Sequence, residues 1–402
     1  MFDKLEYTDQ HDAILALTEK FYKDPRINKI NLGIGVYTNE IGHTPILKSV
    51  KQAEKFLLEK ENSKTYLSIE GMSNFDTYTQ FLLFGNQNIF FEEKRIRTIQ
   101  TPGGTSALRI AADLLATQTK NQRIWISRPS WPNHRNIFIV SGLEVLEYPW
   151  YDSDTHTLSF EKLLLFFKNQ VNEGDVVLFH SCCHNPTGID PNREQWKELA
   201  LWCKKKNLLP LFDCSYQGLD KNIEEDVIGM QIFAHYNEEL LVASSYSKNM
   251  GLYNERVGGL TLITHNTNIA DRVMNKLKAI IRTHYSTPPA HGAAIVTTIL
   301  KNDHLKNIWK NELLVMRNRI KNMRNLFVSY LKKKGIKQDF SFISKQHGMF
   351  SYSGLSLQQV IYLRTKFGIY ILNNGRLNIA SMTPINMNIL CNAIASVVSQ
   401  KE

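Results

Sequence analysis

The feature that most constrains the fold of this chain is a series of short apolar segments separated by longer stretches with helical periodicity. Such segments predict β-strands that are buried on both faces. Strands that alternate with helices in this way form a parallel, doubly wound sheet. We therefore expect an α/β fold with a mostly parallel central sheet between helices, and its clearest strands at residues 124–126, 145–148, 176–180, 209–213 and 240–242.

Polar side chains follow these segments at the points where the strands are predicted to end. Because the carboxyl ends of parallel strands meet at one edge of a sheet, ligand binding and chemistry collect at that edge. The residues that we expect there are Trp131, His134, His180, Asn185, Asp213, Tyr216 and Lys248.

The C-terminal part of the chain has a different pattern. A long amphipathic stretch over residues 306–334 predicts a helix that leads into a second, α+β domain. In that domain we expect strands within residues 342–352 and 377–380 and helices over 357–367 and 387–399. The predicted division is an N-terminal arm and part of the small domain at residues 1–44, a large domain at 45–305 and a small C-terminal domain at 306–402.

Composition narrows the class of protein. The 402 residues include five cysteines without regular spacing, which favours a reducing compartment over a disulfide framework. No apolar run reaches the length of a membrane span, and the N-terminus lacks a secretory pattern, so the expected location is the cytoplasm. The formal net charge of +10 is spread over the chain, which suits small anionic substrates better than nucleic acid.

The segment after the strand at 240–242 places one lysine among hydroxyl groups and an arginine. A lysine at the mouth of a buried strand is desolvated, which lowers its pKa and makes the amine of Lys248 a nucleophile. Ser245, Ser247 and Arg256 are donors suited to a phosphate. An imine-forming amine beside a phosphate site indicates pyridoxal phosphate, and the alternative is a surface loop with a solvated lysine.

Two further motifs point to the same cofactor. Asp213 ends an apolar strand, and a protonated pyridine nitrogen is a suitable partner for such a buried carboxylate; the alternative is an aspartate that caps a turn. The glycine-rich turn at residues 101–105 precedes a run of strong helix formers, and the free N–H groups of a helix start bind anions.

The segment His180-Ser181-Cys182-Cys183-His184-Asn185-Pro186-Thr187-Gly188 also suggests a zinc site. We reject this interpretation, because His180, Cys182 and His184 alternate along an extended segment and cannot close a tetrahedral shell. The tight turn that follows could instead direct Asn185 toward a ring oxygen of the cofactor.

Three motifs together carry a family resemblance: Ser-x-Ser-Lys-x-x-Gly-Leu-x-x-Glu-Arg at 245–256, His-Asn-Pro-Thr-Gly at 184–188 and Phe-Asp-x-x-Tyr-Gln-Gly at 212–218. With matching segments at 31–37, 130–134, 279–289, 348–351 and 375–378, the whole chain resembles the aspartate aminotransferases. These are class I, fold-type I enzymes that depend on pyridoxal phosphate. The resemblance implies reversible ping-pong transamination of L-aspartate and 2-oxoglutarate to oxaloacetate and L-glutamate.

The resemblance also implies a role for each matching residue. Lys248 forms the aldimine with the cofactor and moves the proton, Asp213 pairs with the pyridine nitrogen with His134 behind it, and Trp131 stacks on the ring. The ring oxygen is bound by Tyr216 and Asn185. The phosphate is held by Gly104, Thr105, Ser245, Ser247, Arg256 and, from the neighbouring subunit, Tyr66.

Substrate binding is implied for Gly35, Trp131, Asn185, Arg376 and the neighbouring subunit's counterpart of Arg282. Arg376 would bind the α-carboxylate and Arg282 the distal carboxylate, each through a bidentate pair. The expected protein is therefore a homodimer whose two active sites are shared across the interface, with an N-terminal arm on the partner and no metal.

Few positions depart from the family pattern: Gly103, Ser106, His347 and the pair Asn373-Asn374. An aromatic amino acid aminotransferase with overlapping dicarboxylate activity is the nearest alternative. A pyridoxal enzyme with another outcome, such as a β-lyase or decarboxylase, and a non-enzymatic binding protein are more distant ones.

Overall fold

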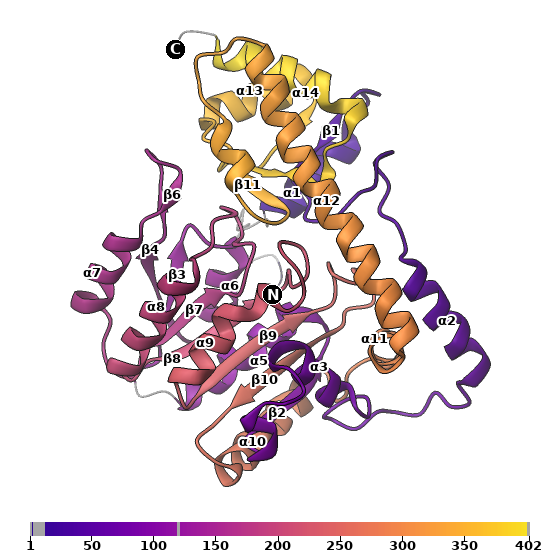
Figure 1. The fold of residues 1–402 in the computed structure, drawn as a ribbon, viewed down its shortest axis with the longest axis vertical. Helices are drawn as coiled ribbons and strands as arrows, with labels where there is room; N and C mark the ends of the chain where they lie inside the picture. The colour runs from indigo at the N-terminus through magenta and orange to yellow at the C-terminus, as the bar shows by residue number, and fades with distance from the viewer. Residues whose placement is uncertain (1, 3–12, 119–120, 400–402) are drawn as a thin grey trace. The chain divides into compact units, whose positions relative to one another are not determined.

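The computed structural model describes residues 2, 13–118 and 121–399, and the chain divides into two units (Figure 1). The large unit consists of Thr44–Lys321 and Gln346–Met349. The small unit consists of Met1–His43, Asn322–Lys345 and Phe350–Glu402. The N-terminal arm that the family resemblance implies lies outside the described residues.

The large unit is built on a seven-stranded sheet with the strand order β2-β10-β9-β8-β7-β3-β4. The pairs from β9 through β8, β7 and β3 to β4 are parallel, whereas β10 is antiparallel to both of its neighbours. The prediction of a mostly parallel sheet is therefore confirmed. The strands are β2 (Ile96–Thr101), β3 (Arg123–Arg128), β4 (Glu144–Pro149), β7 (Val176–His180), β8 (Leu209–Cys214), β9 (Leu240–Ser245) and β10 (Gly258–Ile263).

Both faces of this sheet are covered because side chains alternate between two apolar clusters. In β7, Val176 and Leu178 face one cluster, whereas Val177 and Phe179 face the other. The first cluster packs under α5 (Gly103–Gln118), α6 (Pro132–Val140) and α10 (Thr267–His284). The second packs under α7 (Phe160–Gln170), α8 (Arg193–Lys205) and α9 (Ile228–Tyr236). This two-sided burial explains why the central strands β7, β8 and β9 are largely apolar.

The remaining elements of the large unit surround this sandwich. Helix α12 begins in this unit, and its residues from Asn322 onward belong to the small unit. The elements are α2 (Lys48–Lys60), α3 (Phe75–Phe84), α4 (Ile89–Glu92), β5 (Tyr151–Asp152), β6 (Thr157–Leu158), the 3₁₀ turn η2 (Glu225–Val227), α11 (His291–Lys301) and α12 (Asp303–Lys333).

The small unit combines segments from the N-terminal and C-terminal parts of the sequence. Strand β1 pairs in parallel with β12, with Ile30 opposite Ile369, and β11 pairs antiparallel with β13. The other elements are helical turns and helices. The unit contains α1 (Ala13–Lys23), β1 (Ile30–Asn31), η3 (Ser341–Lys345), β11 (Phe350–Tyr352), α13 (Leu357–Phe367), β12 (Ile369–Tyr370), β13 (Arg376–Asn378), η4 (Ile379–Ser381) and α14 (Pro384–Val398).

The predicted strand within residues 342–352 is wrong in its first half. The chain forms the 3₁₀ turn η3 and then bends at Gly348, whose φ of +68° is a left-handed conformation that glycine adopts without strain. Only Phe350–Tyr352 is extended. None of the described helices combines the length and apolar character that a membrane crossing needs.

Candidate active site

The strand register brings the predicted polar residues of the large unit together. His180 at the end of β7 lies opposite Asp213 of β8, and Asp213 lies opposite Ala243 of β9. Lys248 follows the end of β9 by three residues. The carboxyl ends of three adjacent parallel strands therefore supply one site.

Asp213 is the buried anion of this site. Its Oδ2 lies 2.9 Å from His134 Nε2, and its Oδ1 accepts a hydrogen bond of 2.6 Å from Ser215 Oγ. The other ring nitrogen of His134 lies 2.8 Å from Ser130 Oγ. Burial alone would raise the pKa of Asp213, but the hydrogen bonds with His134 and Ser215 outweigh it and lower the pKa to about 2. The carboxylate is thus ionised at neutral pH although it is enclosed.

Histidine rings pack beside this carboxylate. The ring centroids of His180 and His134 are 5.1 Å apart, and those of His180 and His184 are 4.1 Å apart. His180 Nδ1 accepts a hydrogen bond from the Asn185 backbone N–H, so its proton resides on Nε2. Burial and the neighbouring His134 lower the pKa of His180 to about 3. The ring is therefore neutral at physiological pH.

The suspected zinc segment has another use in the structure. Both ring nitrogens of His184 contact hydroxyl groups, at 2.8 Å from Ser127 Oγ and 2.8 Å from Thr187 Oγ1. Both nitrogen atoms that could bind a metal therefore have hydroxyl partners within the protein. A different set, His134, His180 and Asp213, places ligand atoms within 4.8 Å of one another and could hold a metal ion.

Lys248 lies beside the predicted ring-binding residues. Its Nζ is 5.1 Å from the centroid of the Tyr216 ring, and Asn185 Nδ2 donates to the Tyr216 hydroxyl over 3.5 Å. Trp131, directly before α6, packs edge to face against His134 with centroids 5.1 Å apart. An amine, a phenol, an amide and an indole therefore surround the space next to Asp213.

A cluster of donors follows β9. Ser245 Oγ lies 3.2 Å from Ser247 Oγ, and Arg256 Nη1 donates to Ser247 Oγ over 3.4 Å. The glycines at the start of α5 lie against this cluster: a Cβ on Gly103 would come within 2.6 Å of Arg256 Nη2, and one on Gly104 within 3.1 Å of Ser245 Cβ. Glycine at 103 therefore leaves room for Arg256. Thr105 is exposed in the first turn of α5, so hydroxyls, a guanidinium and free N–H groups share one place.

Tyr66 and Arg282, which are predicted to serve a neighbouring subunit, both lie at the surface of the large unit. The Tyr66 side chain is 90% exposed. Arg282 is exposed in the last turn of α10, where its Nη1 donates to Ser286 Oγ. Both side chains are thus available to a second molecule.

Gly35 and Arg376 belong to the small unit, where one phenylalanine ring links them. The Arg376 guanidinium lies 4.3 Å from the centroid of the Phe350 ring, and a Cβ on Gly35 would lie 3.3 Å from Phe350 Cζ. Asn378 Nδ2 holds the Gly35 segment by donating to the carbonyls of Ile34 and Val36. Arg376 is buried, so a carboxylate that reached it would form a charge pair screened from water.

Ser215 and Ser130 are members of this candidate site that the sequence analysis did not identify. Each hydroxyl contacts a member of the Asp213–His134 pair. Ser215 had a signal, since a residue two positions after Asp213 on an extended segment points to the same face. Ser130 precedes α6, four positions before His134, and without the fold nothing distinguishes it from other serines.

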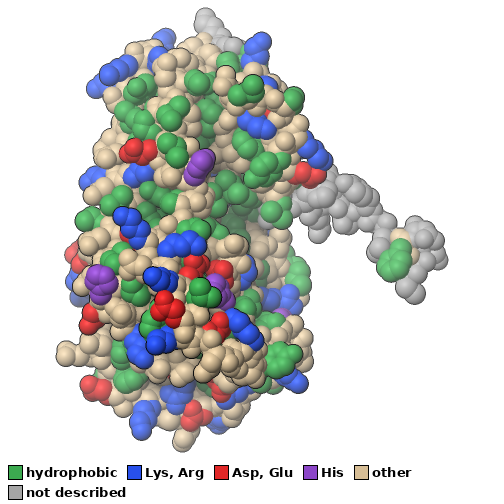
Figure 2. All heavy atoms as spheres, turned by 90° about the vertical axis from the view of Figure 1, so that its right-hand side faces the viewer, with side chains coloured by type: hydrophobic (Ala, Val, Ile, Leu, Met, Phe, Trp, Pro, Cys, Tyr) green, Lys and Arg blue, Asp and Glu red, His purple; other side chains and the backbone are tan. Residues whose placement is uncertain are grey.

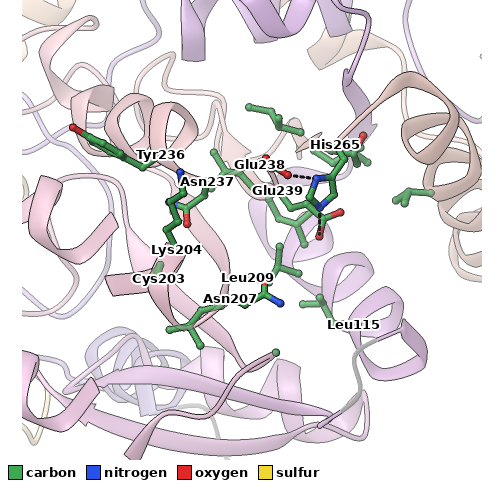
Figure 3. A pocket seen from close by; sticks show the side chains of 18 of the residues that line it. Leu115, Cys203, Lys204, Asn207, Leu209, Tyr236, Asn237, Glu238, Glu239 and His265 are labelled. Atoms are coloured by element: carbon green, nitrogen blue, oxygen red, sulfur yellow. Dashed lines mark ion pairs between the residues drawn. The ribbon is translucent and has the colours of Figure 1, made fainter. Parts of the chain in front are cut away.

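A cavity of about 480 Å³ lies at the opposite edge of the sheet (Figure 3). It is lined by Leu209 and Leu240, where β8 and β9 begin, and by Glu238, Glu239 and His265. Because Asp213 and Ser245 lie at the other ends of these strands, this cavity is separate from the candidate active site.

Comparisons with known proteins agree with the geometry of the site. Residues 27–394 match the family Aminotransferase class I and II. The chain is 55% identical over 387 residues to an aspartate aminotransferase of Escherichia coli strain K12, which covers 96% of this chain and 98% of that protein. It is 51% identical to the aspartate aminotransferase of Haemophilus influenzae, with the same coverage.

A solved structure is also similar over the whole length. This is an aromatic-amino-acid aminotransferase from Burkholderia pseudomallei, covalently bound to pyridoxal phosphate. The TM-score is 0.96 at 44% identity, and the match covers 99% of this chain and 100% of that one. On the sequence match, the structural match and the arrangement of the site, this chain belongs to the class I and II aminotransferases.

Proposed function

We propose that this protein is a pyridoxal phosphate-dependent aspartate aminotransferase, which interconverts L-aspartate plus 2-oxoglutarate and oxaloacetate plus L-glutamate by a ping-pong route. The observation that carries this proposal is the ionised, buried Asp213 in the same site as Lys248 and the donor cluster after β9. The relatives at 51–55% identity are named aspartate aminotransferases, which favours aspartate as the substrate.

The residues present fit pyridoxal phosphate. Asp213 is a carboxylate whose two oxygens are both hydrogen bonded and whose low pKa keeps it negative, as a protonated pyridine nitrogen requires. Gly103 and Gly104 let Arg256 and Ser245 lie close to the start of α5, and these side chains with Ser247 and the free N–H groups of the helix suit a phosphate. When bound, the cofactor supplies an aldehyde that condenses with amines and a ring that accepts electrons from the substrate Cα.

Each protein side chain then has a defined task. Lys248 Nζ would hold the cofactor and, once the substrate amine has released it, would take the proton from the substrate Cα. Tyr216 and Asn185 would orient the ring by donating hydrogen bonds to its oxygen, and Trp131 would cover one side of it. His134 and Ser215 keep the Asp213 carboxylate oriented and charged.

Substrate selection rests on two arginines. Arg376 would bind the α-carboxylate and Arg282 of a second subunit the distal carboxylate, because a guanidinium fork matches a carboxylate with two hydrogen bonds. The exposure of Arg282 and Tyr66 supports their use by a second copy of the chain. We therefore include a homodimer with shared active sites in the proposal.

The proposal also covers location and partners. All five cysteines are free thiols within the described residues, as is common in the cytosol. On the face drawn in Figure 2, basic side chains are interspersed with acidic and apolar ones. This mixture supports small anions, rather than nucleic acid, as the ligands of the positively charged chain.

The test is an assay of the purified protein with pyridoxal phosphate, L-aspartate and 2-oxoglutarate. We expect visible absorbance from the bound cofactor, an altered absorbance band and loss of turnover in Lys248→Ala because the imine with this lysine cannot form, and equal amounts of oxaloacetate and glutamate. A colourless protein that does not take up the cofactor, or products in unequal amounts, would contradict the proposal.

Aromatic aminotransferase activity is the second candidate, favoured by the similarity to the Burkholderia pseudomallei structure. The two candidates differ in the ratio of kcat/KM for aspartate to that for phenylalanine. We expect Arg282→Ala to lower kcat/KM for aspartate by about 10²-fold or more, since one charge-assisted pair is lost, and to leave phenylalanine unchanged or improved. Equal losses on both substrates would refute the assigned role of Arg282.

A further inference from the structure

We propose that Gln100 is a positioning residue that joins the Tyr66 turn to the Arg282 loop, so that both reach the neighbouring subunit's active site as one rigid piece. The Tyr66 turn denotes residues 66–72, and the Arg282 loop denotes residues 282–289. The inference rests on the proposed function, since it assumes that both segments serve the partner's site.

Gln100 lies at the end of β2, and its side chain is completely buried. Its Oε1 accepts a 2.8 Å hydrogen bond from the Met72 backbone N–H, and its Nε2 donates to the Pro289 carbonyl over 2.7 Å. One amide group therefore bridges two segments that are far apart in the sequence.

The Tyr66 turn fits closely against Gln100. The turn closes through hydrogen bonds between Ser68 and Gly71, and the Gln100 backbone N–H donates to the Glu70 carbonyl over 2.9 Å. A Cβ on Gly71 would lie 2.3 Å from Gln100 Cβ, and the φ of +109° at Gly71 also disfavours any side chain there. Glycine at position 71 is therefore what allows the turn to approach Gln100.

Further hydrogen bonds hold the Arg282 loop. The Tyr285 hydroxyl donates to the Gln100 carbonyl over 3.4 Å, and the backbone N–H groups of Tyr285 and Ser286 donate to the Ile281 carbonyl. Ser286 in turn accepts a hydrogen bond from Arg282. The orientation of the guanidinium thus depends on a loop whose far end, Pro289, is fixed by Gln100.

A second link between the two segments lies at the surface. Glu70 forms an ion pair with Lys278, one helical turn before Arg282, and the hydrogen bond from Lys278 lowers the pKa of Glu70. Both side chains are more than a third exposed, and pairs of this kind contribute little in water. The amide of Gln100 is therefore the stronger connection, because Gln100 itself is buried and both of its hydrogen bonds are partly shielded from water.

The first experiment replaces Gln100 by methionine, which has nearly the same size but neither hydrogen-bonding group. We expect kcat/KM for aspartate to fall about tenfold, mainly through a higher KM, because small displacements of a substrate-binding group are costly. Gln80→Met is the matched control: Gln80 is also buried, and its hydrogen bond goes to Thr98, which belongs to neither segment. We expect Gln80→Met to keep the wild-type KM.

Hybrid dimers decide whether Gln100 acts on its own or on the partner's site. In the first hybrid, a Gln100→Met subunit with intact Lys248 is paired with a Lys248→Ala subunit. Its single competent site receives Tyr66 and Arg282 from the subunit with intact Gln100, so we expect wild-type KM. In the second, a Gln100→Met, Lys248→Ala subunit is paired with a wild-type subunit, and we expect the full tenfold loss.

The opposite pattern, with the loss in the first hybrid, would show that Gln100 acts on its own subunit's site and would overturn the inference. Equal KM values in the two hybrids would overturn it as well. If Gln100→Met does not fold, Gln100→Asn, which keeps the amide but shortens its reach, is used in the same pair of hybrids. Wild-type protein without aspartate turnover refutes the proposed function and this inference together, whereas active wild-type protein with the wrong hybrid pattern refutes only the inference.

Discussion

His180 and His184 are the residues in this site whose protonation has the clearest consequence. Burial lowers the pKa of His180 to about 3 and lowers that of His184 well below its ordinary value, because a charged imidazole cannot be hydrated there. The unfolded chain takes up these protons near pH 6.5, but the folded chain does not. Folding is therefore favoured above pH 6.5, and this contribution is lost as the pH falls toward 3.

We expect the free energy of unfolding to fall below pH 6.5 by about 1.4 kcal/mol per pH unit for each of these two histidines. Denaturant unfolding at pH 7, 6 and 5 measures this slope. His180→Gln, which does not titrate, removes one of the two contributions. A slope that is unchanged in His180→Gln would contradict the assignment.

Single residues differ in how far the sequence predicts them. Asp213 and Lys248 follow apolar strands of a parallel sheet, so the fold class alone brings them to one edge. Ser130 and Gln100 have no such signal, because their contacts join segments whose proximity only the tertiary fold creates. Chemistry at strand ends was predictable from local pattern, and the residues that support it were not.

At the scale of helices and strands, the predictions were right where side-chain burial follows a regular pattern, on one face or on both faces of the element. The predicted helix at 357–367 has the same bounds as α13. Strand β10 was not among the predicted strands, and it begins with Gly258 and Gly259, which strands disfavour. Gly258 is needed there since a Cβ on it would lie 2.5 Å from the Ser244 carbonyl oxygen. Close contact between strands, rather than local preference, selects this residue.

Helix α7 offers a direct test of the sheet-covering layer. Leu163 is completely buried in the cluster around Phe179, whereas Leu165, two residues later, is 59% exposed. We expect Leu163→Ala to lower the free energy of unfolding by about 2–5 kcal/mol, because it leaves a cavity. Leu165→Ala should change it by no more than about 0.5 kcal/mol. Urea unfolding followed by circular dichroism compares the two variants. Equal effects would contradict the assignment of Leu163 to the buried face of α7 and Leu165 to the exposed one.

For the molecule as a whole, net charge matters most for encounter with substrate. The formal charge of +10 attracts dicarboxylates over distances comparable to the Debye length, which is about 10 Å at 0.1 M salt. Added salt screens this attraction. Interactions between buried groups of the site are screened much less, so the effect should appear in binding rather than in the chemical step.

We expect kcat/KM for 2-oxoglutarate to fall several-fold, roughly 2- to 10-fold, between about 0.02 and 0.2 M salt. The value for phenylalanine, which carries no net charge, should change much less. Steady-state kinetics over this range measures both. Parallel losses for the two substrates would show that salt acts on the protein and not on the approach of the anion.

The pairing of Ile30 with Ile369 has a consequence for synthesis on the ribosome. Strand β1 leaves the exit tunnel early, yet the strand that completes it is translated almost last. The sheet of the large unit is formed by residues in between, so it can assemble before the partner strand of β1 has been synthesised. We therefore expect nascent chains stalled before residue 369 to carry a protease-resistant middle segment and a cleavable N-terminal tail.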